Sequence, residues 1–155
     1  MNHHPAYSSF LLACLTAVTL LAGSCDKVPI NGDLDGMWQL MDIATPAGHV
    51  DAKPKRVYIS VQLHLTMWEN KLADRKYYAH FEHRGDSIRF YDFVHASLHQ
   101  NTTQDDERIT MQEMSEGLLD DWGVHTTDAR YRIDHLSDSH LILHSNDTII
   151  SFRKM

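Results

Sequence analysis

The stretch Val57-Tyr58-Ile59-Ser60-Val61-Gln62-Leu63-His64-Leu65-Thr66-Met67 decides the fold, because apolar and polar residues alternate through all eleven positions. Alternation with a period of two is typical of a half-buried β-strand, whose successive side chains point to opposite faces. The apolar face comprises Val57, Ile59, Val61, Leu63, Leu65 and Met67. Eleven residues are long for one strand, so we expect it to bend or to carry a bulge.

A β-hairpin follows, because two alternating runs, 77–82 and 88–93, flank the turn sequence Arg84-Gly85-Asp86-Ser87. Gly-Asp between such runs favours a tight turn. This turn pairs Phe81 with Phe90, Glu82 with Arg89 and His80 with Tyr91. We therefore predict that the two phenylalanines share one face of the hairpin and that an ion pair between Glu82 and Arg89 lies on the other.

Alternation returns near both ends of the chain. Residues 130–134, 140–144 and 148–153 read as strands, with turns at 137–139 and 146–147, and residues 36–44 read as an opening strand around Trp38. Residues 108–114 fit either a strand or the entry to a helix.

One helix is predicted, over Ser115 to Trp122. Ser115 would cap it, Gly123 would end it, and Leu118, Leu119 and Trp122 would face inward. Met111 and Met114 extend the same face, so the helix could begin earlier.

The elements together predict an all-β domain over residues 36–155, with about eight strands and one short helix before the last three. An antiparallel up-and-down arrangement of this size removes its exposed edges by closing into a barrel, and a two-sheet sandwich is the alternative. An eight-stranded barrel is either filled by its own side chains or holds one small ligand.

An export signal precedes the domain. Residues 1–24 contain no Asp, Glu, Lys or Arg, and the apolar run from Phe10 to Ala22 is too short for a comfortable membrane span. A buried core helix is the competing interpretation. We predict a signal peptide over residues 1–24 and a tether over residues 25–35.

Cys25 follows the small residues Ala22-Gly23-Ser24, so the stretch from Leu21 resembles a bacterial lipobox. Ordinary cleavage after a small-x-small pattern is the alternative, and it would leave a free thiol. We favour attachment of diacylglycerol and acyl chains such as palmitate at Cys25, because two or three chains anchor a protein firmly. The protein is then expected in the bacterial cell envelope, at the outer membrane, on its periplasmic or outer surface.

The charge balance limits the partners. The chain has 14 basic and 21 acidic residues, a net charge of −7. A nucleic-acid binder needs a clustered basic face, so we expect no nucleic-acid partner. We also expect the lipid at Cys25, not a basic patch, to hold the protein at the membrane.

Motifs for catalysis are absent from the sequence: it has no Gly-x-Ser-x-Gly and no Gly-rich phosphate loop. Twelve histidines make a metal site conceivable, but a zinc site needs three or four ligands that converge on one point, and no Cys-x-x-Cys spacing occurs. We interpret the histidines as surface residues and expect no enzyme activity, no metal and no cofactor.

Apolar residues, most of them aromatic, are the best candidates for a binding site, because they would either fill the barrel or line a pocket in it. The set comprises Trp38, Val61, Leu63, Phe81, Phe90, Tyr131 and Phe152.

The chain also resembles a known family. Asp35-Gly36-Met37-Trp38 resembles the Gly-x-Trp opening of lipocalin-like barrels. The segments 119–124 and 150–154 resemble those of lipocalin-like lipoproteins of anaerobic Gram-negative bacteria. The resemblance as a whole extends from Asp33 to Met155. The resemblance implies a calycin-type barrel, and Trp38 as a structural plug at its floor. The function of these relatives is largely unassigned. We therefore expect a membrane-anchored barrel that binds a small hydrophobic or amphipathic molecule. A filled barrel serving as a protein-interaction or structural module, with an unknown partner, is the alternative.

Overall fold

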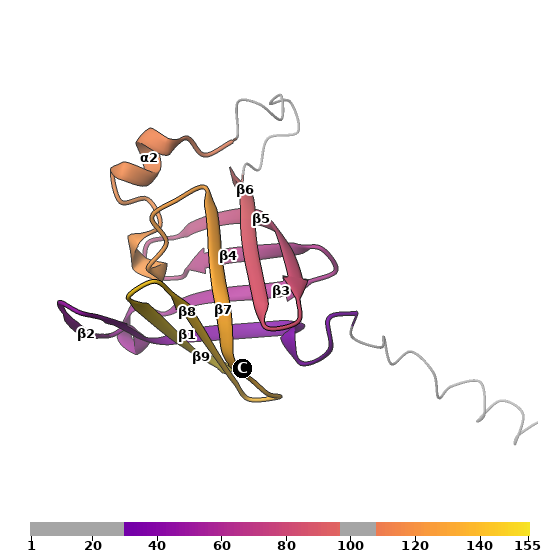
Figure 1. Cartoon of the computed structure of the whole chain (residues 1–155). Helices are drawn as coiled ribbons and strands as arrows, with labels where there is room; N and C mark the ends of the chain where they lie inside the picture. Colours follow the sequence, from indigo (N-terminus) through magenta and orange to yellow (C-terminus); the bar gives the residue numbers. More distant parts are fainter. Residues whose placement is uncertain (1–29, 97–107) are drawn as a thin grey trace, which may run out of the picture.

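The computed structural model describes residues 30–96 and 108–155. They form nine strands, one α-helix and three short 3-10 helices (Figure 1). The strands are β1 (Gly36–Thr45), β2 (Gly48–Asp51), β3 (Val57–Gln62), β4 (Leu65–Asn70), β5 (Arg75–Arg84), β6 (Ser87–His95), β7 (Asp128–Leu136), β8 (His140–Ser145) and β9 (Thr148–Lys154). The helices are η1 (Gly32–Leu34), η2 (Lys53–Lys55), α2 (Met111–Ser115) and η3 (Asp120–Trp122).

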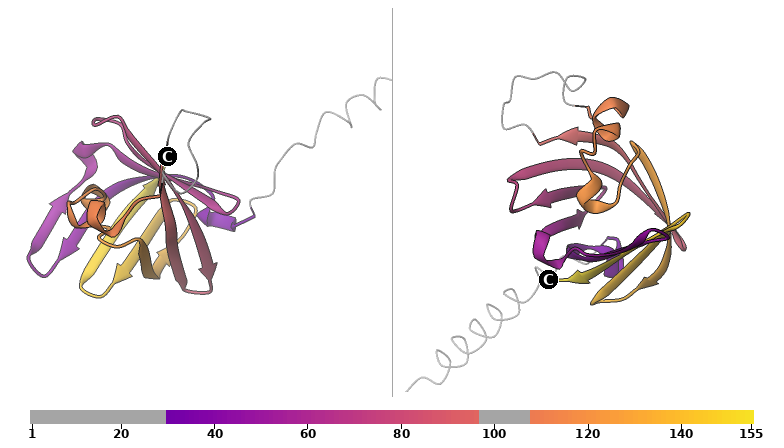
Figure 2. Two further views of the ribbon diagram at one scale, coloured as in Figure 1. Left: turned by 90° about the horizontal axis from the view of Figure 1, so that it is seen from above. Right: turned by 90° about the vertical axis from the view of Figure 1, so that its left-hand side faces the viewer.

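The sheet closes into a barrel. Every neighbouring pair of strands is antiparallel, and β1 pairs with β3 on one edge and with β9 on the other. Eight strands, β1 and β3 to β9, therefore form the closed barrel predicted from the sequence, and β2 is an extra strand on β1 (Figure 2). The short helix α2 precedes the last three strands, also as predicted.

The β5–β6 hairpin has the predicted register: Phe81 pairs with Phe90, Glu82 with Arg89 and His80 with Tyr91. Both phenylalanines are buried, as expected from their shared face. The predicted ion pair is wrong, because Arg89 turns to Asp128 on β7 at 2.6 Å, while Glu82 lies 3.5 Å from Arg84.

The long alternating stretch is not one strand. β3 and β4 pair with Gln62 opposite Leu65, so Leu63 and His64 form a two-residue turn between them. Leu63 adopts a left-handed φ of +56° there and is 53% exposed, so its expected place on the apolar face is wrong. The inward face of β4 carries Thr66 and Trp68, while Leu65 is exposed.

The bounds predicted for the helix, Ser115 to Trp122, are wrong, although Met111 and Met114 had left an earlier start open. α2 begins earlier, and its N-cap is Thr110, whose side chain accepts a hydrogen bond from the Glu113 backbone N–H. Gly117 has φ +85°, which interrupts helical geometry before η3 starts. Gly123 ends η3 in the left-handed conformation, as predicted for this glycine.

The two ends of the barrel differ. One end, called the tether end here, carries η1, the β3–β4 turn and the C-terminus, and lies toward the right and bottom of Figure 1. The opposite end, called the helix end, carries the connection with α2 and η3. In Figure 2, η3 lies in the mouth that the strands form at the helix end.

Candidate functional site

Six of the seven residues predicted to line a pocket lie in the barrel interior. Trp38, Val61, Phe81, Phe90, Tyr131 and Phe152 are all buried. Leu63 is the exception described above. Burial also raises the pKa of the Tyr131 hydroxyl well above its ordinary value, so this hydroxyl stays protonated.

The interior contains a cluster of aromatic rings centred on Trp68. Its ring centroid lies 5.0 Å from that of Phe90, 5.4 Å from Phe93 and 6.2 Å from Trp122, each with edge-to-face geometry. Phe90 in turn contacts Tyr131 at 6.1 Å. Rings at these separations are in van der Waals contact, so this part of the barrel is filled by its own side chains. The sequence interpretation missed Trp68, because it treated residues 57–67 as one strand.

Trp38 closes the tether end. Its indole N–H donates a hydrogen bond to the Leu34 carbonyl of η1 at 2.8 Å. The Lys154 ammonium lies 5.0 Å from the Trp38 ring centroid and donates to the Asp33 carbonyl at 2.7 Å. Gly36 makes this approach possible, because a Cβ there would lie 2.9 Å from Cε of Lys154.

Trp122 closes the helix end. Its indole N–H donates to the Tyr58 carbonyl at 3.2 Å, and its side chain is fully buried. Asp121, the preceding residue, accepts a hydrogen bond from the Asn70 side-chain amide at 2.8 Å and pairs with Lys55 and Arg75 at 3.2 and 3.4 Å. Asp121 thus fixes η3 to three separate elements around the mouth. No sequence motif marks this residue.

A contact between β6 and α2 holds α2 in place. The His95 ring on β6 lies 2.8 Å from the Glu113 carboxylate. That carboxylate also accepts a hydrogen bond from the Thr110 backbone N–H at 2.8 Å. The hydrogen bonds from Thr110 and then from His95 hold the pKa of Glu113 below its ordinary value.

A surface cleft at the tether end, within the part of the chain that the structure describes, is called the tether-end cleft here. It measures about 490 Å³, against 160, 220 and 270 Å³ for three other clefts. Small-molecule sites commonly span about 300–1,000 Å³. The lining residues are Ile30, Asn31, His64, Phe81, Glu82, His83 and Arg84.

The tether-end cleft is lined by apolar and polar side chains. The apolar ones are Phe81, which is buried and is one of the predicted pocket residues, and Ile30, which is 64% exposed. The polar ones include Arg84, an exposed residue at the rim that lies 3.5 Å from Glu82, and His83, whose Nε2 lies 3.0 Å from the Gly85 carbonyl. Such an arrangement suits a molecule with an apolar part and a polar head.

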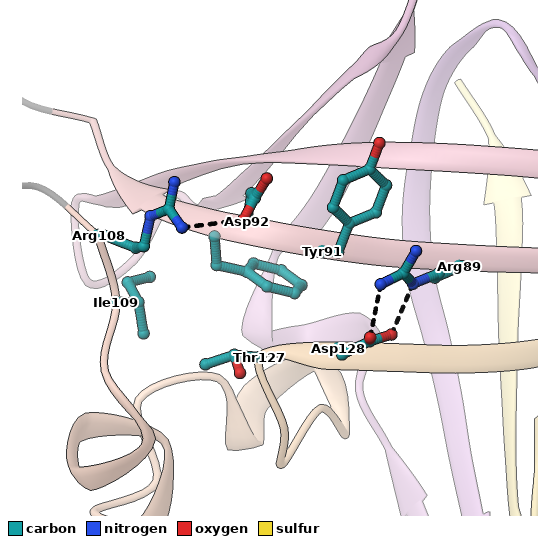
Figure 3. Close-up of a pocket in the computed structure, with 8 residues that line it drawn as sticks. Arg89, Tyr91, Asp92, Arg108, Ile109, Thr127 and Asp128 are labelled. Atoms are coloured by element: carbon teal, nitrogen blue, oxygen red, sulfur yellow. Dashed lines mark hydrogen bonds and ion pairs between the residues drawn. The ribbon is translucent and has the colours of Figure 1, made fainter. Parts of the chain in front are cut away.

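A smaller cleft of about 220 Å³ lies outside the barrel, between β6, β7 and the segment that leads into α2 (Figure 3). Arg89 binds Asp128 through two hydrogen bonds, at 2.8 and 2.6 Å, and lowers the pKa of that carboxyl to about 2. Arg108 lies 3.3 Å from Asp92, which has a left-handed φ of +53° at a bulge in β6. Both guanidinium groups are therefore already paired, so this cleft offers little to a ligand.

The histidines do not converge. Among the residues that the structure describes, no group of three or more His, Cys, Asp or Glu side chains could hold a metal ion. His64 lies in the β3–β4 turn, and His144 pairs with Asp134 at 3.2 Å on the outer surface of β7 and β8. Within the same described ranges, no helix is long and apolar enough to cross a membrane. Cys25 and residues 1–24 lie outside the described residues, so their predicted roles stay predictions.

The closed antiparallel barrel, with a short helix and a buried tryptophan at its start, defines a protein of the lipocalin-like class. The lipocalin-like domain family matches residues 18–155, so the chain belongs to this family. No curated protein matched the chain.

Two solved structures resemble this barrel. A lipocalin-like protein from Bacteroides uniformis is 21% identical, with a TM-score of 0.56 over 80% of this chain and 100% of its own. An uncharacterised protein from Bacteroides eggerthii is 19% identical, with a TM-score of 0.52 over 79% of this chain and 99% of its own. At these identities the likeness supports the fold only.

Proposed function

We propose that the chain is a lipid-anchored, non-enzymatic protein of the bacterial envelope whose barrel binds a small hydrophobic or amphipathic molecule. Membership of the lipocalin-like family supports a binding role. Residues 1–24, which contain no Asp, Glu, Lys or Arg and are followed by Cys25, support export and acylation. The expected location is the outer membrane, on its periplasmic or outer surface.

The tether-end cleft is the observation that carries the binding proposal. Its volume falls in the range of ligand sites, whereas the interior around Trp68 is occupied by aromatic rings. The apolar part of the ligand would lie against Ile30 and Phe81, and its polar head near Arg84 and His83. Binding would be driven by burial of apolar surface, at about 25 cal/mol per Å² before the costs of association.

A fluorescent fatty acid titrated into the purified protein tests this proposal, together with native mass spectrometry for co-purified lipid. Arg84→Ala removes an exposed rim charge and should weaken binding roughly threefold, the scale of a solvent-exposed ionic contact. Arg130→Ala is the matched control, because Arg130 is also exposed, at 69% against 83% for Arg84, but lies outside this cleft. Equal binding by both variants would argue against the site, and no binding by the wild-type protein would exclude the function.

A filled barrel that acts as a protein-interaction or structural module is the second candidate. The observation in its favour is the packing of Trp68, Phe90, Phe93 and Trp122, which leaves the region around these rings without room for a ligand. Absence of any bound lipid or fatty acid, combined with a defined protein partner in envelope extracts, would favour this function instead.

The anchor is tested separately. Cys25→Ala should release the protein from membranes into the soluble fraction, because the acyl chains are its proposed attachment. Cys14→Ala is the control: Cys14 lies inside the predicted signal peptide, so its loss should leave membrane attachment unchanged. Retention of Cys25→Ala in the membrane fraction would refute the anchor.

A further inference from the structure

Three exposed apolar side chains gather at the tether end. Ile30 is 64% exposed, Leu63 is 53% exposed and Met155 is 64% exposed. The Asn31 side-chain amide donates to the Leu63 carbonyl at 2.9 Å, which joins the residue after Ile30 to the β3–β4 turn. The Met155 backbone N–H donates to the Met37 carbonyl of β1 at 2.9 Å. The described chain also starts at this end, with Ile30 immediately before Asn31.

The length of chain between Ile30 and Cys25 limits how far this end can lie from a lipid attached at Cys25. The two residues are five positions apart. A fully extended chain covers at most about 3.3–3.6 Å per residue, which gives a reach of roughly 17 Å. A barrel anchored through Cys25 therefore keeps its tether end near the membrane surface.

Exposed apolar side chains alone do not identify this face, because the helix end also has them. Leu72, in the β4–β5 turn, is 62% exposed. The ten residues of β5 separate the two ends, and strands of that length, tilted as in small barrels, span roughly 25 Å along the barrel axis. The position of the tether therefore distinguishes Leu63 from Leu72.

We propose that the tether end is a membrane-contacting face: Ile30, Leu63 and Met155 lie in the interfacial layer of the bilayer, and the tether-end cleft opens at the lipid surface. This inference rests on the proposed anchor at Cys25. The contact is hydrophobic, because a chain with a net charge of −7 is not attracted to anionic lipid. The molecule bound in the cleft would then reach it directly from the membrane.

Fluorescent labels at matched positions test the proposal on the lipidated mature protein, which begins at Cys25, in phosphatidylcholine vesicles that contain nitroxide-labelled lipid. Leu63→Cys and Leu72→Cys each introduce a thiol in an exposed turn. Met155→Cys adds a second site at the tether end, where the side chain is 64% exposed. An acylated Cys25 carries no free thiol. A thiol-reactive NBD dye then labels only the introduced cysteine.

The nitroxide lipid should quench the dye at positions 63 and 155 at least threefold more than the dye at position 72, and emission at 63 and 155 should shift to the blue. Equal quenching at all three positions, or stronger quenching at 72, would overturn the proposal. A blue shift at 63 without quenching would also overturn it, because a second protein molecule would then cover the face. Failure of the anchor itself has a different signature: the wild-type chain takes up the dye at Cys25 and stays in solution.

Discussion

Replacing Trp68 by alanine tests whether the barrel interior is packed as tightly as the ring distances indicate. Trp68 is almost fully buried, and three aromatic rings lie within 5.0 to 6.2 Å of it. Truncation of a fully buried tryptophan costs about 3–5 kcal/mol of the free energy of unfolding. The lost hydrogen bond to Thr66 adds little, because the Thr66 hydroxyl keeps its own bond to the Ala79 carbonyl at 3.1 Å.

Thermal and urea unfolding measure this loss, and for a domain of this size the melting temperature should fall by roughly 10–25 °C. Met67→Ala is the matched control, because Met67 is adjacent but on the outward face, and it should cost less than about 1 kcal/mol. The Trp68→Ala cavity, on the order of 150 Å³ and apolar, should bind benzene and so regain part of the lost stability. A loss below about 1.5 kcal/mol without benzene binding would refute the packed interior.

Three further predictions concern the closures and one surface ion pair. Gly36→Ala should lower the free energy of unfolding, measured with urea, by about 1–3 kcal/mol, because φ is +122° and the new Cβ would meet the Lys154 side chain. Gly48→Ala, where nothing lies within 4 Å of the new Cβ, should cost less in the same experiment. The pKa of Asp128 is about 2 in the folded protein, below its unfolded value near 4. Its pairing with Arg89 therefore stabilises the fold above pH 4, and this stabilisation is lost as the pH falls from 4 to 2. Asp128→Asn should make the free energy of unfolding depend less on pH in that range, and an unchanged pH dependence would contradict the stabilising role of the pair. Asp121→Ala should cost about 1–3 kcal/mol and accelerate hydrogen exchange around Trp122, whereas unchanged exchange there would show that the carboxylate does not hold η3.

The sequence allowed the register of the β5–β6 hairpin next to its turn to be predicted, because the Gly-Asp turn and the two phenylalanines agree on one pairing; the bulge farther along β6 was not predicted. The β3–β4 turn escaped prediction for a physical reason. Leu63 and His64 carry no turn signal, and Leu63 adopts a left-handed conformation that leucine rarely takes. Alternation therefore continued unbroken across the turn, and the inward face of β4 was assigned to the wrong residues.

The candidate site was predictable only in part. Period-two patterns place Trp38, Phe81 and Phe90 on inward faces, and burial confirms those placements. Whether the rings meet or leave a space depends on contacts between distant strands and η3, such as the one between Trp68 and Trp122, which no local pattern contains. The tether-end cleft was equally unpredictable from local patterns, because it brings Ile30 together with side chains more than thirty positions away in the sequence.

NMR chemical-shift mapping with a medium-chain fatty acid tests most directly whether the ligand binds in the tether-end cleft. The backbone amides of Asn31, His64 and His83 should shift in proportion to bound fatty acid, while those of Trp68 and Phe90 stay in place. Shifts centred on Trp68 and Phe90, or no shifts at saturating fatty acid, would contradict binding at the tether end.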